Sequence, residues 1–188
     1  MKVILFISLI SLFFCHSISQ KGINLIKEFE GCRLTAYQDS VGVWTIGYGT
    51  TSADKSITGT NIYKGLQISQ ATAEEWLRIS VNKKYGPNVD KFDNIYHWSQ
   101  NEFDALCSFA YNIGSINELV SNGNSAKSKI PSVMKLYVHA GGSVLEGLVR
   151  RRKAEVDLFL NGKSPSPDPT PTPSGTININ IQSLIYIL

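Results

Sequence analysis

The chain has 188 residues, of which 43% are hydrophobic and 18% are charged, and its formal net charge is +3. This composition is ordinary for a globular protein, and the length suits one domain with a sizeable core. The charge is too small to indicate a nucleic-acid partner, and we expect none.

The first twenty residues have the layout of a secretory signal. Lys2 precedes an apolar run over residues 3–14, and small residues follow at 17–19. The run is shorter than the roughly 20 residues that span a membrane. We therefore predict a cleaved signal peptide over residues 1–19, a secreted chain and no lasting membrane anchor. A signal-anchor that is released later is the alternative.

Residues 22–31 are predicted to form a short helix. Ile23, Ile26 and Glu30 lie at i, i+3 and i+7, so that Glu30 shares the apolar face, and Gly31 is a natural stop. Residues 34–50 are rich in β-formers, with a turn at 39–42, and predict a hairpin. A third strand and a loop are expected over 51–68.

Helices are predicted over the rest of the globular part. Ser69 or Thr72 caps the first of them, and Gly86-Pro87 is expected to end or kink it. Residues 99–102 form a capping box that opens a second helix, which Gly114 stops. A short helix after position 131, a turn at 140–142 and a last helix over about 147–161 follow.

The composition changes after residue 162. Residues 164–175 form a linker rich in Pro, Ser and Thr, and an apolar tail ends the chain at 188. We therefore predict one domain over residues 20–162 and a linker with tail over 163–188. The order of helix, small sheet and further helices indicates the α+β class.

Two carboxylates are the first candidates for chemistry. Glu30 lies on an apolar face at a helix C-terminus, and both features favour its protonated form, as a general acid requires. Asp39 lies in a hydrated turn, where it would stay ionised. A pair of carboxylates in such contrasting environments is typical of glycoside cleavage. The alternatives are a glutamate turned to solvent and an ordinary turn aspartate.

Thr45 follows Asp39 by six residues. Along the strand its side chain alternates with those of Trp44 and Ile46, so that its hydroxyl could face a cleft beside Asp39 and hold a water. Taken alone, a threonine in a strand is unremarkable.

The spacing of these three residues carries a resemblance to a known family. The frame E-x8-D-x5-T-I-G-Y-G-T resembles the catalytic stretch of the phage-type lysozymes, glycoside hydrolase family 24. The segments DALCSFAYNIG, 104–114, and AGGSVLEGLVRRRKAEVDLFLNG, 140–162, resemble two later parts of that family. The resemblance covers residues 22–162 and implies a lysozyme-like fold, with a small N-terminal β-lobe and a helical C-terminal lobe joined by a long helix.

The resemblance also implies an activity. Glu30 would be the general acid, and Asp39 and Thr45 would activate the water that attacks the β-1,4 bond between N-acetylmuramic acid and N-acetylglucosamine in bacterial peptidoglycan. The expected outcome is inversion, for which the two carboxyl groups would lie about 6.5–9.5 Å apart. The alternatives are a peptidoglycan-binding module without turnover, and a phage endolysin or transglycosylase.

Further roles follow only from matching positions in that family. Tyr111 and Asn112 would lie at the wall of a substrate groove, and Ser132 near a sugar. Arg151 would lie close to Glu30, where its charge opposes protonation of the acid.

The remaining polar features leave alternatives open. Cys32 and Cys107 could form a disulfide or be two small buried residues. The basic run 150–153 is either a solvated helix face or a contact with an acidic cell wall. His97 and His139 show no metal-ligand spacing, so we expect no metal and no cofactor. We expect a monomer that is secreted or held in a lysosome- or phagosome-like compartment, for defence, digestion of bacteria or phage lysis.

Overall fold

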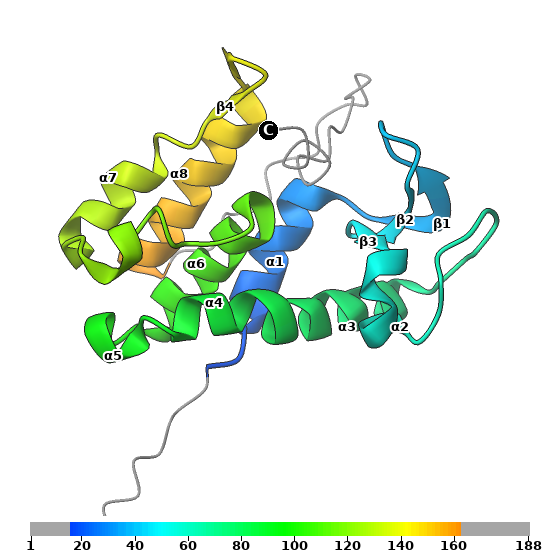
Figure 1. Cartoon of the computed structure of the whole chain (residues 1–188), viewed down its shortest axis with the longest axis horizontal. Coiled ribbons are helices and arrows are strands. Elements are labelled where there is room, and N and C mark those ends of the chain that lie inside the picture. The colour runs from blue at the N-terminus through cyan, green and yellow to red at the C-terminus, as the bar shows by residue number, and fades with distance from the viewer. Residues whose placement is uncertain (1–15, 163–188) are drawn as a thin grey trace, which may run out of the picture.

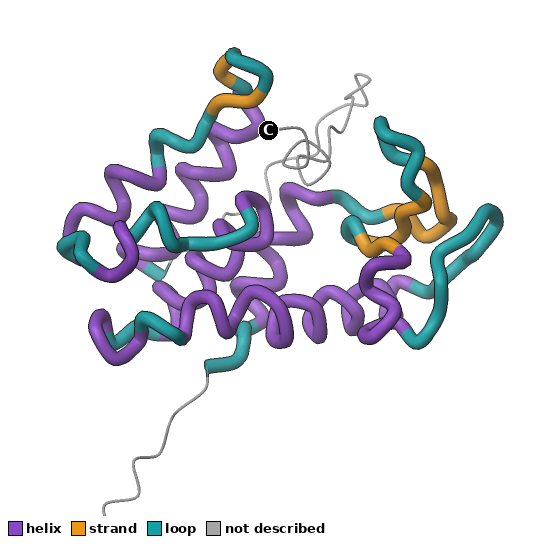
Figure 2. The backbone as a smooth tube through the Cα atoms, in the orientation of Figure 1, coloured by secondary structure: helices purple, strands orange, loops and turns teal. Residues whose placement is uncertain are grey.

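The computed structural model describes residues 16–162. Residues 1–15 of the predicted signal peptide and the linker and tail from 163 onward lie outside the described part. Within it, helices surround a central helix, and a small antiparallel sheet lies at one side of the molecule (Figure 1). Figure 2 shows that the three-stranded sheet is separated from most of the helices. This arrangement confirms the predicted α+β class.

The first helix, α1 (Gln20–Glu30), has the predicted character. Ser19 caps its N-terminus by accepting a hydrogen bond from the backbone N–H of Lys21, and Gly31, with φ of 66°, follows its last residue. Its apolar face, which includes Ile23, is buried against α6 (Gln100–Ile113) and its neighbours. Glu30 is therefore placed where the helix gives way to the sheet.

The sheet contains β1 (Arg33–Gln38), β2 (Trp44–Gly47) and β3 (Thr50–Thr51) in the order β1-β2-β3. The turn between β1 and β2 is the predicted one. The sheet lobe has a small core of its own, separate from the large helical core, and it comprises Ala36, Ile46 and Ile62 with partly buried Trp44, Leu66, Ile68 and Trp76.

The prediction for residues 51–68 is wrong in part. β3 has only two residues, and a 3-10 turn (Ser52–Asp54) and a short helix, α2 (Lys55–Thr58), follow it. Thr51 and Asp54 form a capping box. The Thr51 side chain accepts a hydrogen bond from the backbone N–H of Asp54, and the Asp54 side chain accepts one from the backbone N–H of Thr51. Local bonds between side chains and backbone therefore outweigh the β-propensity of this segment.

A long helical passage joins the two lobes along the front of Figure 1. It consists of α3 (Gln70–Ser80), a π-helical segment (Val81–Tyr85) and α4 (Gly86–Asp90). Its N-cap is Ser69, one of the two capping residues that the sequence predicted. Gly86-Pro87 does not end the helix, because Gly86 keeps helical dihedrals and its N–H reaches back to the carbonyl of Val81 in the π pattern.

The remaining elements build the helical lobe. Ser99 and Glu102 form the predicted capping box of α6, whose residues 103–112 are all buried. No helix within residues 16–162 is long and apolar enough to cross a membrane. The other elements of this lobe are α5 (Asp93–Tyr96), two 3-10 turns (Ser121–Gly123 and Lys127–Lys129), α7 (Ile130–Met134), the hairpin of β4 (His139–Ala140) and β5 (Ser143–Val144), and α8 (Glu146–Asn161).

Candidate active site

Glu30 lies at the junction between the lobes. It is the last residue of α1, its side chain is 15% exposed, and its Oε1 accepts a hydrogen bond from Arg151 at 2.7 Å. The contact with α8 is the one that the family resemblance implied. It joins two residues that are 121 positions apart in the chain, so the carboxylate is fixed only when α1 and α8 are packed together.

Asp39 occupies the hairpin turn, where backbone donors hold it. Its Oδ1 accepts hydrogen bonds from the N–H groups of Val41 at 3.0 Å and Val43 at 2.8 Å. The side chain is partly exposed. These two bonds close the turn and fix the direction of the carboxylate relative to β2.

Thr45 lies in β2 and is fully buried. Its hydroxyl donates to the carbonyl of Val43 at 3.1 Å. The hydroxyl oxygen keeps acceptor capacity beyond that bond, although no part of the residue is exposed to solvent in this structure.

Tyr37 relates these three residues to one another. It is the cross-strand partner of Thr45 in the sheet. Burial raises the pKa of its hydroxyl, Arg33 opposes that rise, and the negative charges of Asp39 and Glu30 add to it. Tyr37 thus pairs with Thr45 and lies within electrostatic range of both carboxylates, and sequence reasoning did not single it out.

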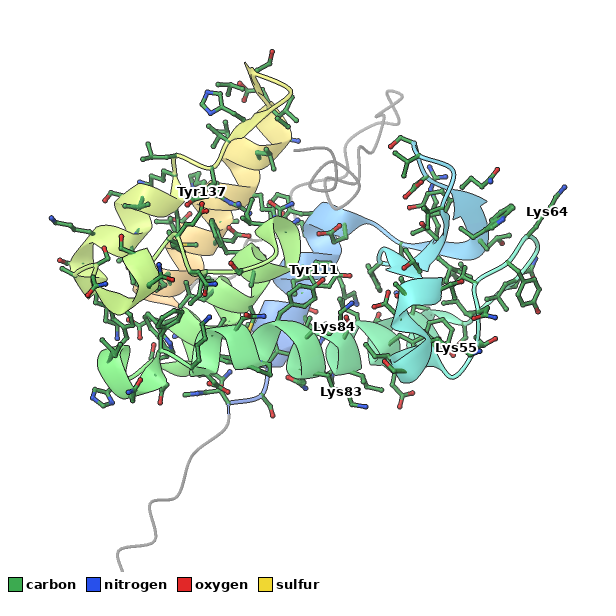
Figure 3. All side chains as sticks on the ribbon, viewed as in Figure 1. Lys55, Lys64, Lys83, Lys84, Tyr111 and Tyr137 are labelled. Atoms are coloured by element: carbon green, nitrogen blue, oxygen red, sulfur yellow. The ribbon has the colours of Figure 1, made fainter. Side chains whose placement is uncertain are left out.

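Of the three residues predicted to contact the substrate, Tyr111 is buried between the two lobes. Tyr111 is 5% exposed, and its hydroxyl donates to the carbonyl of Tyr48 at 2.7 Å, which joins α6 to the sheet lobe. Figure 3 shows Tyr111 at the centre of the molecule, near the long helical passage. Burial raises the pKa of Tyr111 well above its ordinary value, and the nearby charge of Glu30 adds to this effect.

Asn112 and Ser132 also have partners within the protein. Asn112 is 6% exposed and accepts a hydrogen bond from Arg152 at 3.0 Å. Ser132 lies on the exposed side of α7 and donates to the carbonyl of Lys129 at 2.7 Å. Their roles toward a substrate stay predictions.

The basic run 150–153 is not simply a solvated face. Arg150 and Lys153 are exposed, but Arg151 and Arg152 are only 3% and 1% exposed. The helical period divides the run, because consecutive residues point about 100° apart, so two arginines face the core and two basic residues face solvent. The expectation of a solvated face is therefore wrong for the inner pair.

Behind Glu30, the two inner arginines share one fully buried carboxylate, that of Glu155. Arg151 Nε donates to Glu155 Oε1 at 3.1 Å, Arg152 Nη2 donates to it at 2.9 Å, and the Ser108 hydroxyl donates to it at 2.8 Å. Sequence reasoning missed this cluster. The available signal was the spacing of the arginines at i−4 and i−3 from the glutamate on one helix.

The pKa values of the two guanidinium groups respond differently to this environment. Burial would lower the pKa of Arg151, but the charges of Glu30 and Glu155 raise it above its ordinary value. Burial lowers the pKa of Arg152, and Glu155 offsets only part of that effect. Arg151 is thus the better-paired cation of the two.

Cys32 and Cys107 are free thiols, so the possible disulfide is not formed. Cys107 is fully buried in α6, whereas Cys32 is partly exposed just beyond Glu30. Within residues 16–162, no group of three or more His, Cys, Asp or Glu side chains could hold a metal ion.

Comparison with known proteins assigns a family to this fold and site. A family model described as phage lysozyme matches residues 27–155, which include Glu30, Asp39, Thr45 and Arg151. The chain belongs to the phage lysozyme family.

Relatives within this family are endolysins of phages. The endolysin of Lactococcus phage c2 is 45% identical over 146 residues, which are 76% of this chain and 59% of that protein. The endolysin of Acyrthosiphon pisum secondary endosymbiont phage 1 is 35% identical over 154 residues, which are 76% of this chain and 97% of that protein. The chain thus spans somewhat over half of the Lactococcus relative and nearly all of the second.

Solved structures show the same fold. The muramidase domain of SpmX from Asticaccaulis excentricus is 33% identical, with a TM-score of 0.61 over 78% of this chain and 99% of that one. An endolysin from Escherichia coli O157:H7 phage FAHEc1 is 32% identical, with a TM-score of 0.59 over 80% of this chain and 98% of that one. The lysozyme-like fold that the sequence predicted is confirmed.

Proposed function

We propose that this phage lysozyme family member is an exported muramidase, which hydrolyses the β-1,4 bond between N-acetylmuramic acid and N-acetylglucosamine in bacterial peptidoglycan. The observation that carries the proposal is the arrangement around Tyr37. Arg151 holds Glu30 at a helix end, backbone donors hold Asp39 in the hairpin turn, and Tyr37 pairs across the strands with the buried Thr45, while the charges of both carboxylates act on the Tyr37 hydroxyl.

Each residue has a role that its surroundings suit. Glu30 protonates the glycosidic oxygen as the bond breaks, and Arg151 holds it in place for that step. Asp39 accepts a proton from the attacking water, while its turn hydrogen bonds keep its carboxylate still. Thr45 orients the same water, as the family resemblance implies, once its buried hydroxyl becomes accessible on substrate binding. Attack from the face opposite the leaving group would give inversion.

The relatives favour one biological setting among those considered. They are phage endolysins by name, which supports lysis of a bacterial host over defence or digestion. The apolar N-terminal run supports export to the cell wall through a secretory route.

The decisive experiment compares Glu30→Gln with Glu28→Gln on purified peptidoglycan. The two glutamates lie on the same helix, but Glu28 is exposed. We expect loss of a general acid to lower kcat by at least about 100-fold in Glu30→Gln, with little change in Glu28→Gln and with both variants folded by circular dichroism. Full activity in Glu30→Gln would refute the assignment.

Product analysis separates hydrolysis from the alternatives. A muramidase releases fragments with a reducing N-acetylmuramic acid end, and a transglycosylase releases fragments with a 1,6-anhydro end, which mass spectrometry distinguishes. Fragment binding without any product would instead favour the binding-module alternative.

A further inference from the structure

Behind the proposed acid lies a chain of four alternating charges, Glu30, Arg151, Glu155 and Arg152. The side chain of Glu155 is fully buried, and those of Arg151 and Arg152 are 4% and 1% exposed. We call these four residues the buried charge chain. It runs from the junction of the lobes into the contact between α6 and α8.

Buried charges of this kind are costly unless each one has a partner. The two positive guanidinium groups and the two negative carboxylates give this chain of residues a formal net charge of zero. Glu155 is the middle partner, because its carboxylate contacts both arginines, whereas Glu30 forms an ion pair with Arg151 alone within residues 16–162.

Glu155 also decides where Arg151 can point. Arg151 has three anchors: Nε to Glu155, Nη2 to the carbonyl of Ser108 at 3.1 Å, and Nη1 to Glu30. The fork of a guanidinium is rigid, so fixing Nε and Nη2 fixes the direction in which Nη1 donates. The position of Glu30 therefore follows from Glu155, although the two carboxylates are held by different helices.

We propose that Glu155 is a positioning residue for the reaction, which aims Arg151 at Glu30 and neutralises part of its charge. The inference rests on the proposed function of Glu30 as the general acid. Arg151 alone would favour the carboxylate form of Glu30, which cannot donate a proton. A second carboxylate on the same guanidinium offsets part of the positive charge that Arg151 presents to Glu30.

Other charged and titratable groups face this region. Arg152 lies beyond Glu155 on α8, Tyr111 approaches from α6, and Tyr37 approaches from β1. Burial and the charge of Glu30 raise the pKa of both tyrosine hydroxyls, so both stay neutral through the pH range of an activity assay. The charged groups near Glu30 are therefore Arg151, Arg152 and Glu155 on α8, together with Arg33 and Asp39 on the sheet lobe beside Tyr37.

The test is the pH dependence of kcat/KM for wall hydrolysis, whose alkaline limb reports loss of the acid's proton in the free enzyme. Glu155→Gln removes one negative charge and should move that limb to lower pH by about one unit. Arg152→Met removes one positive charge and should move it to higher pH. The double variant restores the balance and should return the limb toward the wild-type position. Thermal unfolding is measured in parallel for every variant.

Glu155→Asp separates aiming from charge. It keeps the negative charge on a shorter side chain, so it should leave the limb near the wild-type pH while lowering kcat. A purely structural role predicts lower thermal stability in all variants without opposite shifts of the limb.

The outcomes decide the inference separately from the proposed function. Absence of product from the wild-type enzyme would refute the proposed function itself. An active wild type with an unmoved limb in folded Glu155→Gln would overturn only the role of Glu155. If Glu155→Gln does not fold, Glu155→Asp decides: a lower kcat with the limb near the wild-type pH supports the inference, and an unchanged kcat in the folded variant overturns it.

Discussion

The residues just before α1 should contribute several kcal/mol to stability, although they fall inside the predicted signal peptide. We call residues 16–19 the N-terminal strap. Ile18 is 3% exposed, and its N–H donates to Asn82 on the long helical passage at 2.9 Å. Ser19 caps α1, and both its N–H and its hydroxyl donate to the buried carboxylate of Asp104.

The magnitude of the loss follows from these contacts. Exposing a fully buried isoleucine costs about 1.5–3 kcal/mol, and loss of an N-cap costs about 1 kcal/mol. Asp104 would lose two donors, at a cost of about 1–3 kcal/mol, which water entering the vacated space reduces. A chain that begins at residue 20 should therefore be less stable than one that begins at residue 16 by about 3–5 kcal/mol.

Thermal unfolding followed by circular dichroism measures this difference. For a domain of this size, 1 kcal/mol shifts Tm by about 2–4 °C, so the shorter chain should unfold at least about 6 °C lower. Ile18→Ala in the longer chain is the matched single-site control and should show part of the loss. Equal Tm values for the two chains would refute the reasoning.

The strap also bears on where an exported chain begins. A cut after Ser19 would remove the cap of α1 and the buried Ile18 together. We therefore expect the mass of the exported protein to correspond to an N-terminus at or before His16. A mature N-terminus at residue 20 in a stable, active protein would contradict this expectation.

Three smaller predictions test the surroundings of the site. Gly22→Ala should lower Tm, because a Cβ there would lie 2.7 and 2.9 Å from side-chain carbons packed against α1. Tyr111→Phe should cost about 1 kcal/mol in urea unfolding, since the carbonyl of Tyr48 loses its donor. Iodoacetamide should label Cys32 and not Cys107 in the native protein, and because burial raises the pKa of Cys32, its labelling rate should rise at higher pH than that of an ordinary thiol.

Most helix boundaries could be predicted because local chemistry sets them. Ser99 and Glu102 are three residues apart and satisfy each other's backbone donors, whatever the rest of the chain does. The same local chemistry misled the prediction after residue 50, where β-branched residues suggested a strand but Thr51 and Asp54 start a turn of helix. The capping residues predicted the structure of this segment better than β-propensity did.

Contacts between distant parts of the chain could not be predicted from the pattern of residue types in the sequence. Arg151 and Arg152 belong to a basic run that commonly faces solvent, and only the packing of α8 on α6 shows that two of its four residues point inward. The partner of Arg151 across 121 residues came from family resemblance, not from spacing. Glu155 carries no motif, and its only sequence signal is its spacing of three and four residues from the two arginines on one helix.

This dependence on distant contacts has a consequence for how the acid forms during folding. Glu30 belongs to the first helix and Arg151 to the last, so the pair forms only after the chain has closed nearly its full length. The hairpin that holds Asp39 closes over four residues and needs no such contact. The water-handling side of the proposed site is therefore local, whereas its acid side requires α8. A fragment that ends before residue 146 can keep the hairpin but lacks the arginines and Glu155, and for this reason we expect it to have no hydrolytic activity on peptidoglycan even if its sheet lobe forms.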